Sequence, residues 1–370
     1  MAEYPNVVLI EEGMREGFQI ESADIPVEKK NLVLEALSET GLKRIVVGSF
    51  VSPKWTPQMA DIDRLVASMH PVAGVVYTAL ALNDRGRERM AAYVPPLSWP
   101  SELPETLVHL CDVFAQRNTG RTQQAEIDSW EKIVEGALRG GASQAGIGVN
   151  AAWGSNWIGL FSLEQRMEML HRQVDLWKTN DIDVVKVFLG DPMGWNMPDQ
   201  VEEQLKATIA EWPGISTFHL HLHNTRGTAP ISIYTALRAL RATDTLILDA
   251  AIGGMGGCPY CGNGRAAGLT PTEDLVYLLE ELGISTGIDL FRLIDVVALA
   301  EEVVGHPLYG HVSKAGPRPR GSHLYAMDMP FVETLGQAQH FRLGPGVYEG
   351  AMSPWREPIR SETRPESTKS

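Results

Sequence analysis

The sequence predicts an α/β protein, a (β/α)8 TIM barrel with a C-terminal appendage. Three observations support this fold class. Eight short apolar runs with strand character follow one another between residues 7 and 252, and amphipathic stretches of helical period separate several of them. The chain of 370 residues accommodates such a barrel, which typically takes about 250 residues. After residue 305 the alternation stops, and glycine and proline become frequent.

The predicted strands are spaced as βα units require. They cover residues 7–12, 44–50, 75–82, 106–113, 144–152, 184–191, 218–224 and 245–252. Helices are expected between strands, for example over 27–41, 162–180 and 230–244, and the first of these stretches ends at a glycine suited to a helix C-cap. A doubly wound open sheet is the alternative, but the turn "EEGMREGFQ" after the first strand lacks the Gly-x-Gly-x-x-Gly spacing typical of that fold.

The break in the pattern also predicts the domain organisation. We expect a catalytic barrel domain over residues 1–304 and an appendage over residues 305–355, where "GHPLYGHVSKAGPRPRG" is rich in glycine and proline. The appendage is expected to cover the barrel mouth or to build a dimer contact. Residues 356–370 are polar enough to be predicted disordered.

Composition excludes several classes of protein. The chain is 44% hydrophobic and 21% charged, as is typical of a globular protein in water. A net charge of -14 argues against nucleic acid as a partner, although a local arginine such as Arg226 or Arg265 is compatible with small anionic substrates. Because no signal peptide and no run of about 18 apolar residues is evident, we expect a cytoplasmic protein without a membrane segment. Three cysteines (Cys111, Cys258, Cys261) are too few for a disulfide framework.

Histidines on the seventh predicted strand indicate a functional site. His219, His221 and His223 are spaced by two residues, so all three face the barrel interior. His221 and His223 lie nearest the C-terminal end of the strand, where two imidazoles can bind one divalent metal; a polar interior layer is the alternative. Arg15 and Glu16 follow the first strand at the same mouth. Glu16 could complete a metal site, and Arg15 could hold a carboxylate or a developing enolate oxygen.

Six ordered segments carry a resemblance to a known family. They are "REGFQ" (15–19), "SFVSPKWTPQM" (49–59), "LGDPMG" (189–194), "HLHNTRG" (221–227), "GGMGGCPY" (253–260) and "TEDLVYLLEELGISTG" (272–287). Over most of residues 6–300 the sequence resembles 3-hydroxy-3-methylglutaryl-CoA lyase and its relatives. This metal-dependent barrel superfamily also includes isopropylmalate and citramalate synthases and 4-hydroxy-2-oxoacid aldolases. The segments "SFVSPKW" and "GGCPY" favour the lyase branch.

The resemblance implies a role for each matching residue. A divalent cation, Mg²⁺ or Mn²⁺, would be bound by Glu16, His221 and His223 and would chelate substrate oxygens. Arg15 would stabilise the enolate formed as a carbon–carbon bond breaks, and Cys258 would handle a proton near that cation. Positions lining the pocket match Gln19, Ser49 and Asp191. Coenzyme A would be part of the substrate, and the protein is expected to be a homodimer.

Four positions depart from the family pattern. Glu16 stands where the family usually has Asp, and Val46 stands where it has Glu on the second strand. The metal-binding Asn after the glycine-rich loop aligns with Leu269, so Asn263 is the substitute we predict as a metal ligand. The coenzyme A contacts of the lyases have no clear counterpart, with Lys314 the nearest basic residue.

The stretch "GGMGGCPYCGNGR" (253–265) allows three interpretations. A Cys-Pro-Tyr-Cys dithiol normally begins a helix in a small βαβ fold, whereas here it follows the last barrel strand. Zinc binding through Cys258 and Cys261 would need two further soft ligands, and only Cys111 is left. We therefore predict a loop whose glycines permit closure over substrate, with Cys258 as the working thiol. Cys261 is a bystander or forms a reversible disulfide with Cys258.

Other candidate residues surround the predicted mouth. Trp153, Trp157 and Trp195 follow the fifth and sixth strands and could form an aromatic wall, with Trp157 as a substrate contact; simple packing is the alternative. Arg226 could grip an additional carboxylate or could be solvated.

Together these residues favour a carbon–carbon lyase acting on a 3-hydroxy-3-methylglutaryl-CoA-like thioester. An aldolase for a free 4-hydroxy-2-oxoacid is one alternative. A condensing acyltransferase with His311 as base is another. A relative that has lost turnover is the third.

Overall fold

The computed structural model describes residues 3–81, 83–100, 103–258, 260, 268–321 and 324. The chain divides into two compact units, Met1–Ser313 and Lys314–Ser370. The first unit contains every strand named below. Most of the predicted appendage and all of the predicted tail lie outside the described residues, so that division of the chain stays a prediction.

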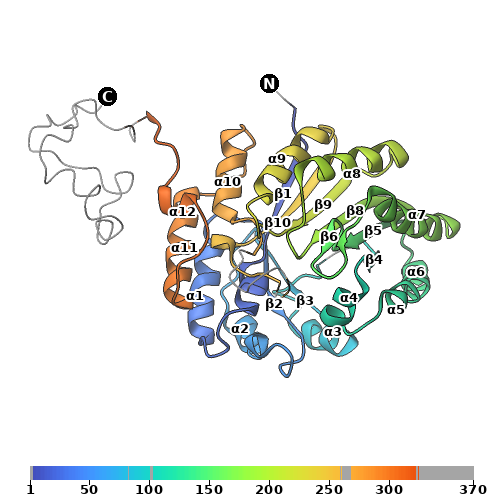
Figure 1. Ribbon diagram of the computed structural model, residues 1–370. Helices are drawn as coiled ribbons and strands as arrows, with labels where there is room; N and C mark the ends of the chain where they lie inside the picture. The colour runs from blue at the N-terminus through green and yellow to red at the C-terminus, as the bar shows by residue number, and fades with distance from the viewer. Residues whose placement is uncertain are drawn as a thin grey trace, which may run out of the picture. The chain divides into compact units, whose positions relative to one another are not determined.

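Eight parallel strands form one sheet, which confirms the predicted barrel class. Figure 1 shows how the sheet curls. The sheet order is β3-β2-β1-β10-β9-β8-β5-β4, so the first strand pairs with the last, and no ladder joins β3 to β4 within the described part of the chain. Each strand coincides with a predicted apolar run. They are β1 (Asn6–Glu11), β2 (Arg44–Ser49), β3 (Val76–Leu80), β4 (Glu105–His109), β5 (Gln144–Asn150), β8 (Asp183–Asp191), β9 (Thr217–Leu222) and β10 (Thr245–Ala250).

Helices surround the sheet, as expected from the amphipathic stretches (Figure 1). Short helical segments η1 (Gly13–Gly17), η2 (Pro57–Met59) and η3 (Ile252–Gly254) and a small hairpin of β6 (Gly154–Ser155) and β7 (Gly159–Leu160) follow several strands. The α-helices are α1 (Val27–Ser38), α2 (Ile62–Ser68), α3 (Asp84–Ala91), α4 (Asp112–Thr119), α5 (Gln123–Ile127), α6 (Trp130–Arg139), α7 (Leu163–Thr179), α8 (Pro198–Glu211), α9 (Ala229–Ala239), α10 (Thr272–Glu281), α11 (Leu290–Val304) and α12 (Val312–Ala315).

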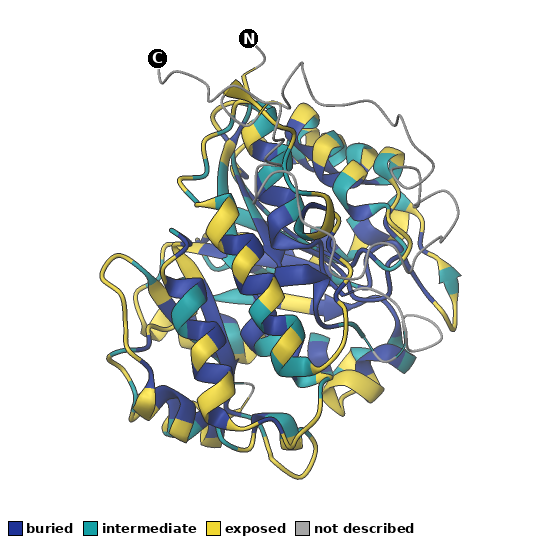
Figure 2. Cartoon of the chain, turned by 90° about the vertical axis from the view of Figure 1, so that its left-hand side faces the viewer, coloured by how far each residue is buried: buried dark blue, intermediate teal, exposed yellow. Residues whose placement is uncertain are grey.

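The core lies between the sheet and the helices. Ile45 and Val47 of β2 pack outward into one cluster with Leu34 and Leu37 of α1, and each of these side chains is almost fully buried. Burial of such a side chain contributes roughly 1.5–3 kcal/mol. In Figure 2 the sheet is mostly buried, while the helices expose their outer faces. Because strand residues alternate, the other side of each strand faces the barrel interior and positions the site at its mouth.

None of the helices in the described ranges has the length and apolar character needed to cross a membrane.

Candidate active site

The site lies at the carboxyl ends of the strands, where β1 and β9 deliver their functional side chains. After β1 the chain turns at once into the π-helical segment η1, in which the backbone N–H groups of Arg15, Glu16 and Gly17 all donate to the carbonyl oxygen of Glu12. This tight turn directs Arg15 and Glu16 back over the barrel mouth. The regular pleat of β9 carries His219 and His221 on one face, and His223 follows directly.

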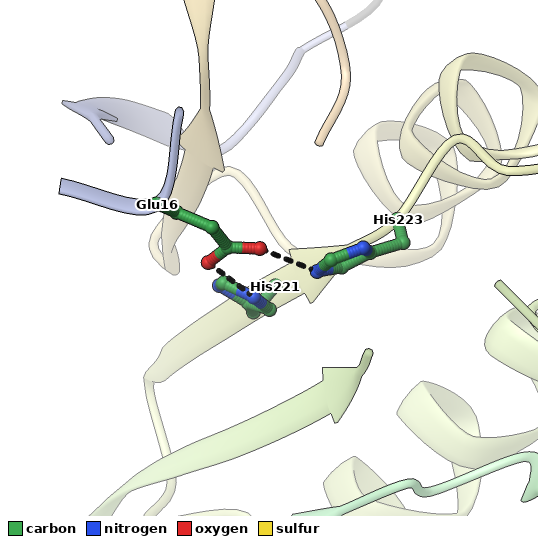
Figure 3. Close-up of side chains that lie close together, drawn as sticks. All are labelled: Glu16, His221 and His223. Carbon is green, nitrogen blue, oxygen red and sulfur yellow. Dashed lines mark ion pairs between the residues drawn. The ribbon is translucent and has the colours of Figure 1, made fainter. Parts of the chain in front are cut away.

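Glu16, His221 and His223 converge on one point (Figure 3). Glu16 Oε1 lies 2.8 Å from His223 Nε2, and Glu16 Oε2 lies 3.4 Å from His221 Nε2. One candidate ligand atom from each side chain lies within 4.8 Å of the others. Two imidazoles and a carboxylate form a donor set that suits divalent cations. His223 Nδ1 is buried and has no hydrogen-bond partner within the part of the chain that the structure describes, so the described protein groups do not satisfy this ring. The residues present therefore fit a bound divalent cation.

Charge in this cluster is strongly coupled. Burial alone would raise the pKa of Glu16, but the neighbouring His223, His221 and Arg15 outweigh burial and hold the pKa far below its ordinary value. Burial would lower the pKa of His221, yet Glu16 and Asp249 raise it to about 9. In the ion-free chain His221 therefore carries a proton at neutral pH, and a metal ion must displace that proton.

Asp249 of β10 fixes two histidines at once. Its Oδ1 lies 2.9 Å from His219 Nε2, and its Oδ2 lies 2.8 Å from His221 Nδ1. Despite burial, these two histidines lower the pKa of Asp249, which stays ionised. With Nδ1 directed at Asp249, Nε2 of His221 faces Glu16. This is the carboxylate–histidine arrangement that commonly orients metal ligands.

Arg15 lies between two carboxylates. Its Nε donates to Glu12 Oε2 at 2.6 Å, and its Nη2 lies 3.1 Å from Glu16 Oε2. Although burial opposes its charge, Glu12 and Glu16 raise the pKa of Arg15, which remains a guanidinium. Burial raises the pKa of Glu12, and Arg15 opposes that rise.

These groups line a cavity of about 700 Å³. Six of the predicted site residues lie on its wall: Arg15, Glu16, Gln19, His221, His223 and Cys258. Phe114 and Phe188 add apolar surface, and Asn118 and Asn150 add amide groups. The cavity wall therefore combines the charged cluster with apolar and amide groups that can contact the rest of a substrate.

Four other predicted residues are not on the described cavity wall. Asp191 is buried and accepts hydrogen bonds from the backbone N–H groups of Trp195 and Asn196, at 2.9 and 2.6 Å. Ser49 is buried at the end of β2. Arg226 donates to the carbonyl oxygens of Met193 and Gly194, so it supports the loop after β8.

The fourth of these residues, Trp157, is 38% exposed. Its ring centroid lies 5.1 Å from that of Tyr260. Trp153, by contrast, is completely buried, and Trp195 is partly buried against the same core. The three tryptophans therefore do not lie on one exposed wall.

Several further candidates are placed elsewhere or lie outside the described residues. Asn263, Cys261 and Arg265 are not among the residues that the structure describes. Leu269 is buried and forms a backbone bridge with His223. His311 is 83% exposed and pairs with Asp274, and it is not on the cavity wall.

Sequence reasoning missed Glu12 and Asp249 as members of the site. Asp249 had a usable signal, because an acid inside the apolar run "TLILDAAI" requires a partner when it is buried. Glu12, the second Glu of "IEEG", had no such signal, since charged residues at strand ends are common.

The fold and the site together define a barrel enzyme with a carboxylate–histidine cluster at its mouth. Comparison with known proteins identifies the family of this enzyme. Residues 6–300 match the family model described as HMGL-like. The chain therefore belongs to the HMGL-like family, and it is a carbon–carbon lyase.

Similar proteins cover most of the chain. It is 30% identical over 313 residues to the mitochondrial hydroxymethylglutaryl-CoA lyase of Gallus gallus. The aligned region covers 84% of this chain and 98% of that protein. It is 32% identical over 324 residues to (R)-citramalyl-CoA lyase of Chloroflexus aurantiacus, spanning 84% and 95%.

Solved structures agree with these relatives. The HMG-CoA lyase of Bacillus subtilis aligns with a TM-score of 0.69 at 30% identity, covering 85% of this chain and 99% of that one. An HMG-CoA lyase from Acinetobacter baumannii, in complex with coenzyme A and 3-methylmalate, aligns with a TM-score of 0.70 at 28% identity, covering 89% and 100%.

Proposed function

We propose that this lyase is metal-dependent and cleaves a hydroxyacyl-CoA thioester of the 3-hydroxy-3-methylglutaryl-CoA type. The observation that carries the proposal is the largely buried Glu16–His221–His223 cluster, with Arg15 against it and Cys258 on the wall of the same cavity. The relatives named above act on two thioesters that differ in their acyl groups, so the thioester is the shared feature of the proposed substrate.

Glu16, His221 and His223 would hold Mg²⁺ or Mn²⁺ in this proposal. When bound, such an ion supplies Lewis acidity that acidifies a substrate hydroxyl and polarises the adjacent carbonyl. Asp249 holds His221 with Nε2 toward the ion position, and Arg15 brings a fixed positive charge to the same side of the cavity.

The chain's own residues then direct the bond cleavage. The substrate hydroxyl gives its proton to solvent, and the O–H electron pair forms a new carbonyl while the neighbouring carbon–carbon bond breaks and its electrons form an enolate. The guanidinium of Arg15 stabilises the negative enolate oxygen. The thiol of Cys258 donates its proton to the enolate carbon, and the resulting thiolate regains a proton from solvent.

The test is a mass-spectrometric turnover assay with Mg²⁺ or Mn²⁺. It offers 3-hydroxy-3-methylglutaryl-CoA and citramalyl-CoA beside free 4-hydroxy-2-oxoacids, with Cys258→Ala as the control. We expect acetyl-CoA release from a thioester by the wild type and at least a hundredfold slower release by the variant. Cleavage of the free acids alone would identify an aldolase and remove the thioester from the proposal.

A further inference from the structure

Glu12 is a carboxylate at the mouth of the barrel whose position the proposed reaction does not use. It lies on the cavity wall and is 7% exposed. Its one side-chain hydrogen-bond partner within the described chain is Arg15, at 2.6 Å. Glu16, in contrast, has its two oxygens directed at His223 and His221 and also lies 3.1 Å from Arg15. Arg15 is therefore shared by two carboxylates. Glu12 has no other side-chain partner among the described residues, and Glu16 is needed by the histidines.

The strands explain how Glu12 reaches this place. In the parallel pairing of β1 with β2, Glu11, the last residue of β1, lies opposite Ile45. Glu12 directly follows β1, and Val46 is the corresponding next residue of β2. Ile45 and Val47 pack outward against the helices, which leaves Val46 on the inner side of the barrel. The two corresponding positions thus hold one carboxylate and one apolar side chain, and the carboxylate directly follows β1.

The charges around the proposed ion site indicate what the Glu12–Arg15 ion pair does. The three carboxylates are those of Glu12, Glu16 and Asp249, and the guanidinium is that of Arg15. When the histidines are neutral, these groups carry a net charge of two negative charges, which a divalent cation balances. Without the Glu12 charge, Arg15 has Glu16 as its remaining carboxylate partner. The guanidinium then competes with the ion for Glu16, and the potential that attracts the ion is weaker as well.

We infer that Glu12 is a positioning residue: it holds Arg15 through its own carboxylate and so keeps Glu16 available to the metal ion. The inference rests on the proposed function only in taking Glu16, His221 and His223 as the ion's ligands. It predicts that ion affinity, and not only turnover, depends on a carboxylate that does not touch the ion.

The test measures Mn²⁺ affinity of the full chain without substrate, from the electron paramagnetic resonance signal of free Mn²⁺. Glu12→Gln keeps the size of the side chain and an acceptor for Arg15 but removes the charge. We expect Mn²⁺ to bind at least tenfold more weakly to this variant than to the wild type. Glu11→Gln is the matched control, because Glu11 directly precedes Glu12 at the end of β1 and bonds to Gly13, Ile252 and Thr272 instead of Arg15. It should bind Mn²⁺ within twofold of the wild type.

Moving the carboxylate provides a second measurement. Glu12→Val should bind Mn²⁺ as weakly as Glu12→Gln, and the double variant Glu12→Val with Val46→Glu should recover affinity to within threefold of the wild type. Wild-type affinity in Glu12→Gln, or an equal loss in Glu11→Gln, would overturn the inference. If Glu12→Val does not fold, the isosteric Gln variant decides alone.

The outcomes also separate this inference from the proposed reaction. The expected Mn²⁺ pattern in a chain that cleaves no thioester would leave the role of Glu12 standing and remove the reaction. Thioester cleavage by the wild type, together with unchanged Mn²⁺ affinity in Glu12→Gln, would support the reaction and remove the role of Glu12. A wild type that takes up no Mn²⁺ would overturn both.

Discussion

Asp249 joins two histidines that the strand period had already placed on one face. A carboxylate has acceptors on both oxygens, so it can hold His219 and His221 together. An amide at the same position has one acceptor and one donor. At least one of the two rings would then lose its bond or change its tautomer, and His221 would no longer be fixed with Nε2 toward Glu16.

We therefore predict that Asp249→Asn weakens Mn²⁺ binding by roughly 10- to 100-fold, as is common when a carboxylate behind a ligating histidine is changed. The measurement is a calorimetric titration at pH 7.5. Asp244→Asn is the control, because Asp244 is also buried, at the opposite end of the same strand, and pairs with Arg241. Equal weakening in both variants would show a general loss of structure instead of an effect on His221.

Individual site residues were predictable where a period or a motif placed them. The spacing of two put His221 and His223 on one face, and the structure brings them to Glu16. Glu12 and Asp249 were not predicted. Glu12 meets Arg15 only through the short π-helical turn, which has no period to read, and Asp249 meets its histidines from another strand about 30 residues away in the sequence. Arg226 illustrates the opposite case: its type suggested an anion, but its side chain is used on loop carbonyls.

At the scale of elements, the loop carrying Cys258 is tied to the β6–β7 hairpin. Asn156 Nδ2 donates to the carbonyl oxygen of Tyr260 at 2.6 Å, and Asn156 Oδ1 accepts from Trp195 Nε1 at 2.8 Å. One amide therefore links the segments that follow β5, β8 and β10. We therefore expect the position of Cys258 on the cavity wall to depend on this link, and the cluster of Glu16, His221 and His223 to be independent of it.

We predict that Asn156→Ala lowers kcat/KM about tenfold and leaves Mn²⁺ affinity within twofold of the wild type. The variant loses two hydrogen bonds of about 1 kcal/mol each, and part of that lost energy weakens the positioning of Cys258 for the reaction. Steady-state kinetics on the substrate found by turnover provide the measurement. Asn180→Ala removes a similar amide–carbonyl bond, to Leu176 at the end of α7. A similar decrease of kcat/KM in Asn180→Ala would contradict a specific role for the hydrogen bonds of Asn156.

Strands were predicted more completely than the segments between them. Long apolar runs identify a buried strand because both of its faces must avoid water. The π-helical turn η1 and the two-residue strands β6 and β7 are too short to show a period. These short segments carry Arg15, Glu16 and Asn156, so the geometry of the site depends on elements that periodicity does not reveal.

At the scale of the whole molecule, two buried acids, one on the first strand and one on α10, bond to the segment that follows the last strand. Glu11 at the end of β1 accepts from the backbone N–H groups of Gly13 and Ile252 and from the hydroxyl of Thr272. Glu273 of α10 accepts from the backbone N–H of Gly253. Burial is the main reason that the pKa of Glu11 rises to about 7 and that of Glu273 to about 8. Closure of the barrel between β1 and β10 therefore places two carboxyls that resist ionisation in the core.

This arrangement makes the free energy of unfolding fall as pH rises. Both groups ionise near 4.5 in the unfolded chain, so between about pH 4.5 and 8 the folded chain binds more protons than the unfolded chain. The stability is fully present below that window and is lost as pH rises through it, by up to about 3 kcal/mol for Glu11 alone.

We predict that Glu11→Gln removes much of this dependence, because an amide keeps the acceptor for the two backbone N–H groups without a group to ionise. Its free energy of unfolding in urea, measured with EDTA present, should match the wild type at pH 5 and exceed it at pH 8 by on the order of 1–3 kcal/mol. The double variant Glu11→Gln with Glu273→Gln should show a still smaller slope. Glu131→Gln, at an exposed site on α6, should retain the wild-type slope. A Glu11→Gln chain that loses stability between pH 5 and 8 as steeply as the wild type would mean that Glu11 ionises in the folded barrel as easily as in the unfolded chain.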